Sequence, residues 1–122
     1  MKTIGLIGGM SWESSIVYYR LINERVRERL GGLHSAKCVM VSVDFAEIEV
    51  LQLENKWAEA GERMVAAAHS LELSGVECVV LCTNTMHKLA DEIQRNIHIP
   101  FLHIADATAE KVKVAGLHRV GL

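Results

Sequence analysis

The sequence predicts an α/β fold, an open parallel sheet with helices on both faces, on the strength of three observations. Short runs of apolar and β-branched residues alternate with longer stretches in which apolar residues recur every three or four positions, the period of an amphipathic helix. The links between these segments are short and contain glycine, serine or proline. Strands that alternate with helices in this way form parallel sheets with right-handed crossovers.

The first predicted strand covers residues 3–7, and the Gly8–Gly9 pair allows a sharp turn where it ends. Ser11 can cap the helix that follows, which is expected to run to about Leu30 and to end at Gly31–Gly32. Residues four apart lie on one face of this helix: Tyr18, Ile22, Val26 and Leu30.

The second predicted strand, residues 38–43, is nearly continuous apolar and β-branched, which indicates a strand covered on both faces. Asp44 and Phe45 leave this strand, and a short helical turn is expected over residues 46–53. A longer helix then carries an apolar stripe, and Ser74–Gly75 ends it. The stripe consists of Trp57, Ala60, Met64, Ala67 and Leu71.

The third predicted strand covers residues 77–82, and a helix is expected over roughly residues 86–96, with Leu89 and Ile93 on its apolar side. Pro100 then marks the start of a fourth strand over residues 101–104.

The chain beyond the fourth strand predicts a last helix that begins at Asp106 or Thr108 and ends at Gly116. The residues that follow are typical of the beginning of another strand. We therefore expect an α/β domain over residues 1–116 and the start of a second, missing α/β domain over residues 117–122.

Composition favours a globular domain of the cytoplasm. Half of the 122 residues are apolar and 23% are charged, a balance that argues against a disordered chain. The formal net charge of -2, without a Lys/Arg block, gives no reason to expect nucleic acid as a partner. The apolar runs are far too short to span a membrane, and the N-terminus has no signal-peptide layout. Three cysteines are an odd number, which favours free thiols in a reducing compartment.

Polar residues follow three of the predicted strands: Ser11, Asp44, and Thr83 with Asn84 and Thr85. The carboxyl ends of parallel strands meet at one edge of a sheet, where open α/β sheets bind ligands. Backbone N–H groups at the helix starts, together with these side chains, suit a small carboxylate or phosphate and fit an amino acid held by its charged ends. The alternative, that these residues only cap helices and shape turns, stays open on the sequence alone.

Two other kinds of site are not expected. Residues 5–9 lack the Gly-x-Gly-x-x-Gly spacing of a dinucleotide site, and no Lys-Ser/Thr pair follows them as in a P-loop. Cys78 and Cys82 lie about 13 Å apart along one strand, too far to bind one metal ion together. The histidines show no paired ligand spacing, so no metal is expected.

Cys82 and Thr83 are the two candidates for an acid/base group at the end of the third strand. A thiolate is available near neutral pH and an alkoxide is not, which favours Cys82 on chemistry. Strand alternation puts Cys82 on the face of Cys78 and Val80, where it would pack against a helix as a small apolar residue. Thr83, at the tip of the strand, is better placed and is the poorer acid or base.

The run Thr-Asn-Thr-Met-His at residues 83–87 resembles the signature of the aspartate/glutamate racemase family, which is usually Cys-Asn-Thr-x-His. Thr83 stands where the family has its first catalytic cysteine, as in the enterobacterial members that carry threonine there. Further segments are similar to the same family, so that the resemblance covers essentially the whole chain: residues 4–14, 18–19, 21–23, 42–45 and 100–108.

The resemblance implies a racemase without a cofactor, in which two acid/base groups flank the α-carbon of aspartate or glutamate. It also implies two similar α/β domains that each supply one group, with the substrate in the cleft between them. Thr83 takes the first position. Asn84 and Thr85 would hold the substrate carboxylate. Met10 and Gln52 would line the same pocket. The second group belongs to the missing C-terminal domain, so this chain alone is expected to be inactive.

A second hypothesis is a non-catalytic α/β module that binds a small carboxylate or another subunit. The missing second acid/base group and the unpaired strand expected at the end of the chain favour it. An exposed strand edge also makes a homo-oligomer possible. Ligand binding without exchange of the α-proton would favour this module.

Overall fold

The computed structural model describes residues 1–83 and 89–102. Within these ranges, four parallel strands form one sheet in the order β2-β1-β3-β4. The strands are β1 (Ile4–Gly8), β2 (Cys38–Ser42), β3 (Cys78–Leu81) and β4 (Phe101–Leu102). The helices are α1 (Trp12–Leu30), α2 (Phe45–Leu53), α3 (Trp57–Leu73) and α4 (Ala90–Asn96). The predicted α/β fold with a parallel sheet is confirmed.

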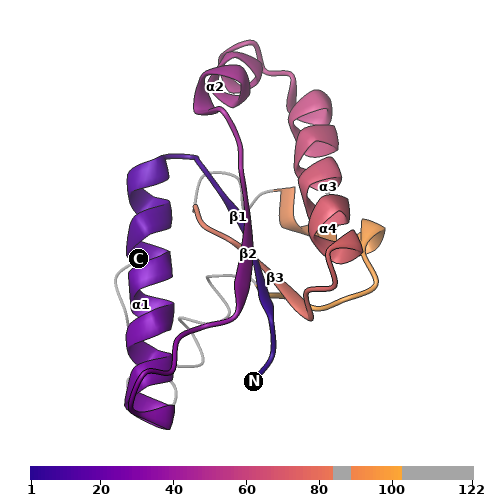
Figure 1. Cartoon of the computed structure of the whole chain (residues 1–122). Coiled ribbons are helices and arrows are strands. Elements are labelled where there is room, and N and C mark those ends of the chain that lie inside the picture. Colours follow the sequence, from indigo (N-terminus) through magenta and orange to yellow (C-terminus); the bar gives the residue numbers. More distant parts are fainter. Residues whose placement is uncertain (84–88, 103–122) are drawn as a thin grey trace, which may run out of the picture.

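Helices lie on both sides of the sheet (Figure 1). α1 lies along one face, α3 and α4 lie on the other, and α2 lies beyond the carboxyl end of β2. The connection from β1 to β2 runs over the face that α1 covers. The connections from β2 to β3 and from β3 to β4 run over the opposite face. Right-handed crossovers require this change of face when the direction along the sheet reverses.

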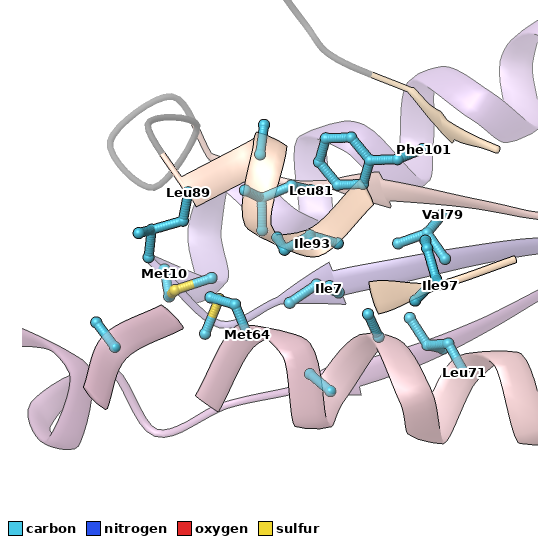
Figure 2. Packing of buried hydrophobic residues seen from close by; sticks show 14 of the residues in the cluster. Ile7, Met10, Met64, Leu71, Val79, Leu81, Leu89, Ile93, Ile97 and Phe101 are labelled. Atoms are coloured by element: carbon cyan, nitrogen blue, oxygen red, sulfur yellow. The ribbon is translucent and has the colours of Figure 1, made fainter. Parts of the chain in front are cut away.

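The main hydrophobic core lies between the sheet and the helices α3 and α4 (Figure 2). It joins Ile7, Val79, Leu81 and Phe101 of the sheet to Ala60, Met64, Ala67 and Leu71 of α3 and to Ile93 of α4. Trp57, at the start of α3, packs half-buried against this cluster. The apolar stripe predicted for α3 is therefore confirmed.

α1 is covered much less than α3. It ends at the predicted place, and Ser15 is its only buried residue. Of the predicted stripe, Leu30 is 51% exposed and the other three residues are half-buried. Leu30 is exposed although it lies on the same predicted face, and the cause is the difference in length between helix and strand. A helix of 19 residues is about 28 Å long, whereas a strand of five residues covers about 17 Å, so the last turns of α1 extend past the sheet.

β2 also differs from the prediction of a strand covered on both faces. It is the outermost strand on its side of the described sheet and pairs there with β1 alone. Val39 is 36% exposed and Met40 is 37% exposed. A continuous apolar run identifies a strand, but it does not fix the position of that strand in the sheet.

Several predicted features lie outside the described residues. These are residues 86–88 of the predicted fourth helix, residues 103–104 of the fourth strand, the last helix and the boundary between residues 116 and 117. Within the described ranges, α2 begins at Phe45 and β3 ends at Leu81, each one residue from its predicted limit. None of the helices in these ranges has the length and apolar composition that a membrane span requires.

Candidate functional site

The segments that leave β1, β2 and β3 meet at the carboxyl edge of the sheet, as the sequence predicted. The N–H of Val43, just after β2, donates to the carbonyl of Gly8 at 2.9 Å. The N–H of Cys82, just after β3, donates to the carbonyl of Ile7 at 2.9 Å. These two bonds extend the sheet pairing to the very end of β1, so the three strand ends are fixed relative to one another.

Gly9 brings the turn after β1 into close contact with the segment after β2. Its φ is +97°, in the region that favours glycine. A Cβ atom at this position would lie 2.2 Å from the carbonyl oxygen of Val43 and 2.8 Å from its nitrogen. No side chain fits there, so Gly9 allows a tight turn after β1, as the sequence predicted.

Ser11 holds the N-cap position of α1, but its side chain makes no capping hydrogen bond. The hydroxyl of Ser15, one turn into the helix, takes part in the local bonding instead. Its Oγ accepts the N–H of Gly9 at 2.9 Å and donates to the carbonyl of Ser11 at 3.4 Å. The position predicted for the cap is therefore right, but the side chain of Ser11 does not make the expected hydrogen bond.

Met10 and Gln52, the two residues expected to line a pocket, belong to neighbouring parts of this edge. Met10 is only 4% exposed and lies in the core cluster with Met64 and Leu89 (Figure 2). Leu51 of α2 belongs to the same cluster, and Gln52, the next residue, is half-buried. The side chain of Met10 thus anchors the turn after β1 to the core, and α2 packs over the carboxyl edge.

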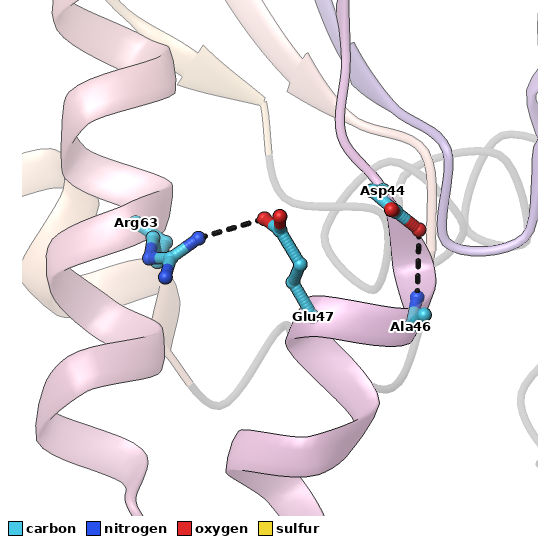
Figure 3. A network of polar contacts seen from close by, with 4 residues as sticks. All are labelled: Asp44, Ala46, Glu47 and Arg63. Carbon is cyan, nitrogen blue, oxygen red and sulfur yellow. Dashed lines mark hydrogen bonds and ion pairs between the residues drawn. The ribbon is translucent and has the colours of Figure 1, made fainter.

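Asp44 has a clear structural role at the edge. Its Oδ1 accepts the N–H of Ala46 at 3.0 Å and so caps α2 (Figure 3). One turn further on, Glu47 accepts a hydrogen bond of 2.9 Å from Arg63 of α3, and the two side chains form an exposed ion pair. These contacts hold α2 between the strand end and α3.

Cys82 and Thr83 lie at the end of β3 in different surroundings. Cys82 is 0% exposed, and this burial raises the pKa of its thiol to about 12. Burial, and secondly the proximity of Cys82, raise the pKa of Tyr18 on α1, which places the thiol on the α1 face of the sheet. Thr83 is 9% exposed and follows Cys82, two residues beyond the end of β3.

Asn84 and Thr85 lie outside the described residues, so their place relative to Thr83 remains a prediction. In the part of the chain that the structure describes, no group of three or more His, Cys, Asp or Glu residues could hold a metal ion. The bonding of Ser15 was not predicted from the sequence, although a serine four residues after a helix cap is a usable signal for a hydroxyl that bonds back to the preceding turn.

The chain is similar to known proteins over nearly its whole length. The Asp/Glu/Hydantoin racemase family model matches residues 7–122. A crystal structure named as a candidate Asp/Glu racemase of Yersinia pestis is 57% identical, with a TM-score of 0.91, over 95% of this chain and 50% of that chain. An aspartate racemase homologue from Pyrococcus horikoshii OT3 is 33% identical, with a TM-score of 0.87, over 95% and 50%.

The aspartate racemase of Picrophilus torridus, at 19% identity and a TM-score of 0.75, shares the fold and covers 95% of this chain and 49% of its own. The chain thus spans about half the length of the solved structures that it matches. With a match that extends over nearly all of its residues, this chain belongs to the Asp/Glu/Hydantoin racemase family.

Proposed function

We propose that this chain is the N-terminal half of an amino-acid racemase that acts on aspartate or glutamate without a cofactor and is inactive alone. The observation that carries the proposal is Thr83, a buried polar side chain at the tip of β3, where three strand ends meet. A buried polar side chain needs a reason to be buried, and a part in the site supplies one here. The names of the relatives support an acidic amino acid as the substrate.

The reaction divides between two halves of the site. A base from the missing C-terminal domain removes the α-proton of the L-amino acid and leaves a carbanion. The hydroxyl of Thr83 then gives a proton to the opposite face of the carbanion. The cycle closes when the alkoxide of Thr83 takes a proton from solvent and the base releases the α-proton to solvent. Asn84 and Thr85 bind the substrate carboxylate, and Met10 and Gln52 limit the pocket. Because an alkoxide is hardly available at neutral pH, Thr83 is a poor base, and the reverse reaction is slow.

Cys82 is not the proton donor in this proposal. A thiol with no exposed surface cannot contact a substrate as either acid or base. Burial raises its pKa to about 12, so the thiolate that would act as a base is hardly present at neutral pH, and the thiol is a weaker acid than an exposed cysteine. Thr83 is therefore the better candidate, although a threonine hydroxyl is the weaker acid.

The first experiment measures α-proton exchange of L- and D-aspartate in heavy water by NMR. The samples are the 122-residue chain and a version extended by the second domain of the Yersinia pestis relative. We expect exchange only in the extended protein, and faster for L-aspartate. In that protein, Thr83→Ala should lower the rate at which L-aspartate is converted to D-aspartate about a hundredfold, as expected for loss of a general acid.

Cys82→Ala is the matched control for Thr83→Ala, because it changes the adjacent residue. It should leave the rate of this conversion unchanged. Exchange by the 122-residue chain itself, or equal rates for the two enantiomers that depend on Cys82, would contradict the proposal. Binding of aspartate to the extended protein without exchange would instead favour the non-catalytic module.

We also propose that the protein is cytoplasmic, and that the second domain and a second copy of the protein are its partners. Sedimentation of the extended protein tests the homo-oligomer directly: a monomer at all concentrations would exclude it.

A further inference from the structure

A pocket lies between α1 and the segment of residues 31–37 that joins this helix to β2. Its volume is about 430 Å³, and pockets for small ligands start at roughly 300 Å³. Arg20 and Arg27 of α1 and His34 of the joining segment line it. Because β2 begins at Cys38, the pocket lies toward the amino edge of the parallel sheet, at the end opposite to Thr83.

Asn23 fixes the two walls of this pocket to each other. Its Nδ2 donates to the carbonyl of Tyr19 at 2.9 Å, and its Oδ1 accepts the N–H of Ala36 at 2.8 Å. At the end of the helix, the N–H of Gly31 donates to the carbonyl of Arg27 at 2.7 Å. The hydrogen bonds of the chain itself thus hold the pocket in shape, and a preorganised site binds at a lower cost.

The charges in the pocket favour an anion. Arg20 and Arg27 lie on one side of α1, two turns or about 10.5 Å apart along its axis. Glu24 lies between them and pairs with Arg20 at 3.7 Å, but the two side chains are largely exposed, and such pairs are weak. Within the described part of the chain, the side chains of Arg27 and His34 make no ion pair or hydrogen bond. Two guanidinium groups against one carboxylate give the pocket a net positive charge.

A simpler role for Arg27 is to complement the negative end of the helix dipole, as basic residues in a last turn do. Arg29 stands in the same turn and has the same role open to it. Only Arg27 of the two lines the pocket. The two arginines therefore form a matched pair, in which the helix-end role is shared and the pocket is not.

We propose that this pocket binds a small organic or inorganic anion with two negatively charged groups of the carboxylate or phosphate class. A guanidinium group matches either of them with two parallel hydrogen bonds. Two arginines that stand two turns apart suit two charged groups, because each arginine can hold one of them. The ring of Tyr19, 49% exposed, adds an apolar surface to the pocket. The site does not depend on the proposed function.

Pyrophosphate and citrate are the probes for this site. Each is titrated into the 15N-labelled chain at constant ionic strength, which keeps the screening of charges fixed. We expect saturable NMR shifts at the backbone amides of residues 19–27 and 34–35. The probe that binds more tightly shows whether phosphate or carboxylate is preferred. No saturable shift with either probe would overturn the proposal.

Arg27→Gln should weaken binding of the preferred probe about tenfold or more, as for the loss of a hydrogen bond between charged groups. Arg29→Gln is the matched control: it removes the same charge from the same helix turn, but outside the pocket, and should leave the affinity nearly unchanged. Equal losses in the two variants would overturn the proposal, because they would mean a general attraction of anions to this end of α1.

Glu24→Gln tests the site in the opposite direction. It removes the carboxylate that lines the pocket and should tighten binding severalfold. Glu28→Gln is its control, since Glu28 is paired with Arg25 at 4.0 Å and does not line the pocket. Should Arg27→Gln destabilise the end of the helix, this second pair still decides. An equal effect of the two substitutions, or no gain from Glu24→Gln, would contradict the site.

Discussion

Cys82 and Thr83 are adjacent, but their surroundings differ. Cys82 is fully buried and lies near Tyr18 of α1, whereas Thr83 follows two residues beyond the end of β3 and is 9% exposed. A shift of one position along the chain therefore separates a packed thiol from a hydroxyl at the carboxyl edge of the sheet.

The buried thiol of Cys82 predicts a pH dependence of stability. Its pKa is about 12 in the folded chain and about 8.5 in the unfolded chain. Below pH about 8.5 both states keep the proton, and the thiol has no effect. Between pH about 8.5 and pH about 12, the thiol loses its proton in the unfolded state but keeps it in the folded state. The free energy of unfolding therefore falls as pH rises, by at most about 1.4 kcal/mol per pH unit.

Urea unfolding at several pH values above 8 measures this slope. Cys82→Ala is the comparison, since it removes this titration alone. Burial also raises the pKa values of Cys38 and Cys78, so a smaller slope of the same sign should remain in the variant. If both proteins have the same slope, the thiol of Cys82 is not protected from solvent.

At the scale of a single element, α2 depends on its first residue. Asp44→Ala should lower the free energy of unfolding by about 1 kcal/mol, because the N–H of Ala46 loses its acceptor. Asp44→Asn keeps the acceptor and should cost only a few tenths of that. Thermal or urea unfolding of the two variants makes the comparison.

Glu47→Gln is the control for charge in the same helix turn. The pair of Glu47 with Arg63 is exposed, and such pairs contribute about 0–1 kcal/mol. A larger loss from Glu47→Gln than from Asp44→Ala would mean that the ion pair, and not the cap, holds α2. Weaker aspartate binding in Asp44→Asn without a loss of stability would instead give Asp44 a part in the site.

Most elements could be predicted from the sequence, because each depends on local patterns. The apolar stripe of α3 and the glycine at the end of α1 place these helices within a residue or two. The exposure of β2 and the overhang of α1 could not be predicted, since they depend on strand order and relative lengths.

The convergence of polar residues at the carboxyl edge followed from the parallel sheet alone. The hydrogen bond from the N–H of Gly9 to the hydroxyl of Ser15 did not, because it depends on the close approach of this hydroxyl to Gly8, which has no Cβ atom. The sequence rule for N-caps names the residue in the cap position but not the side chain that bonds.

At the scale of the whole molecule, the two faces of the sheet are packed unequally. α3 buries six of its 17 residues, whereas α1 buries one of 19. Large apolar side chains on α1 stay exposed: Trp12, Ile16, Val17, Tyr19, Leu21 and Leu30. Because helices in proteins are stabilised mainly by the packing of their apolar face, α1 should be the less firmly held layer.

Native-state hydrogen exchange should therefore show α1 opening at a lower free energy than α3. A pair of substitutions makes the difference quantitative. Leu71→Ala, at a site with 0% exposure on α3, should cost about 2–5 kcal/mol of unfolding free energy. Ile22→Ala, at a half-buried site on α1, should cost clearly less and should speed exchange in α1 while α3 keeps its protection. Equal opening free energies for the two helices would mean that the sheet and both of its layers unfold as one unit.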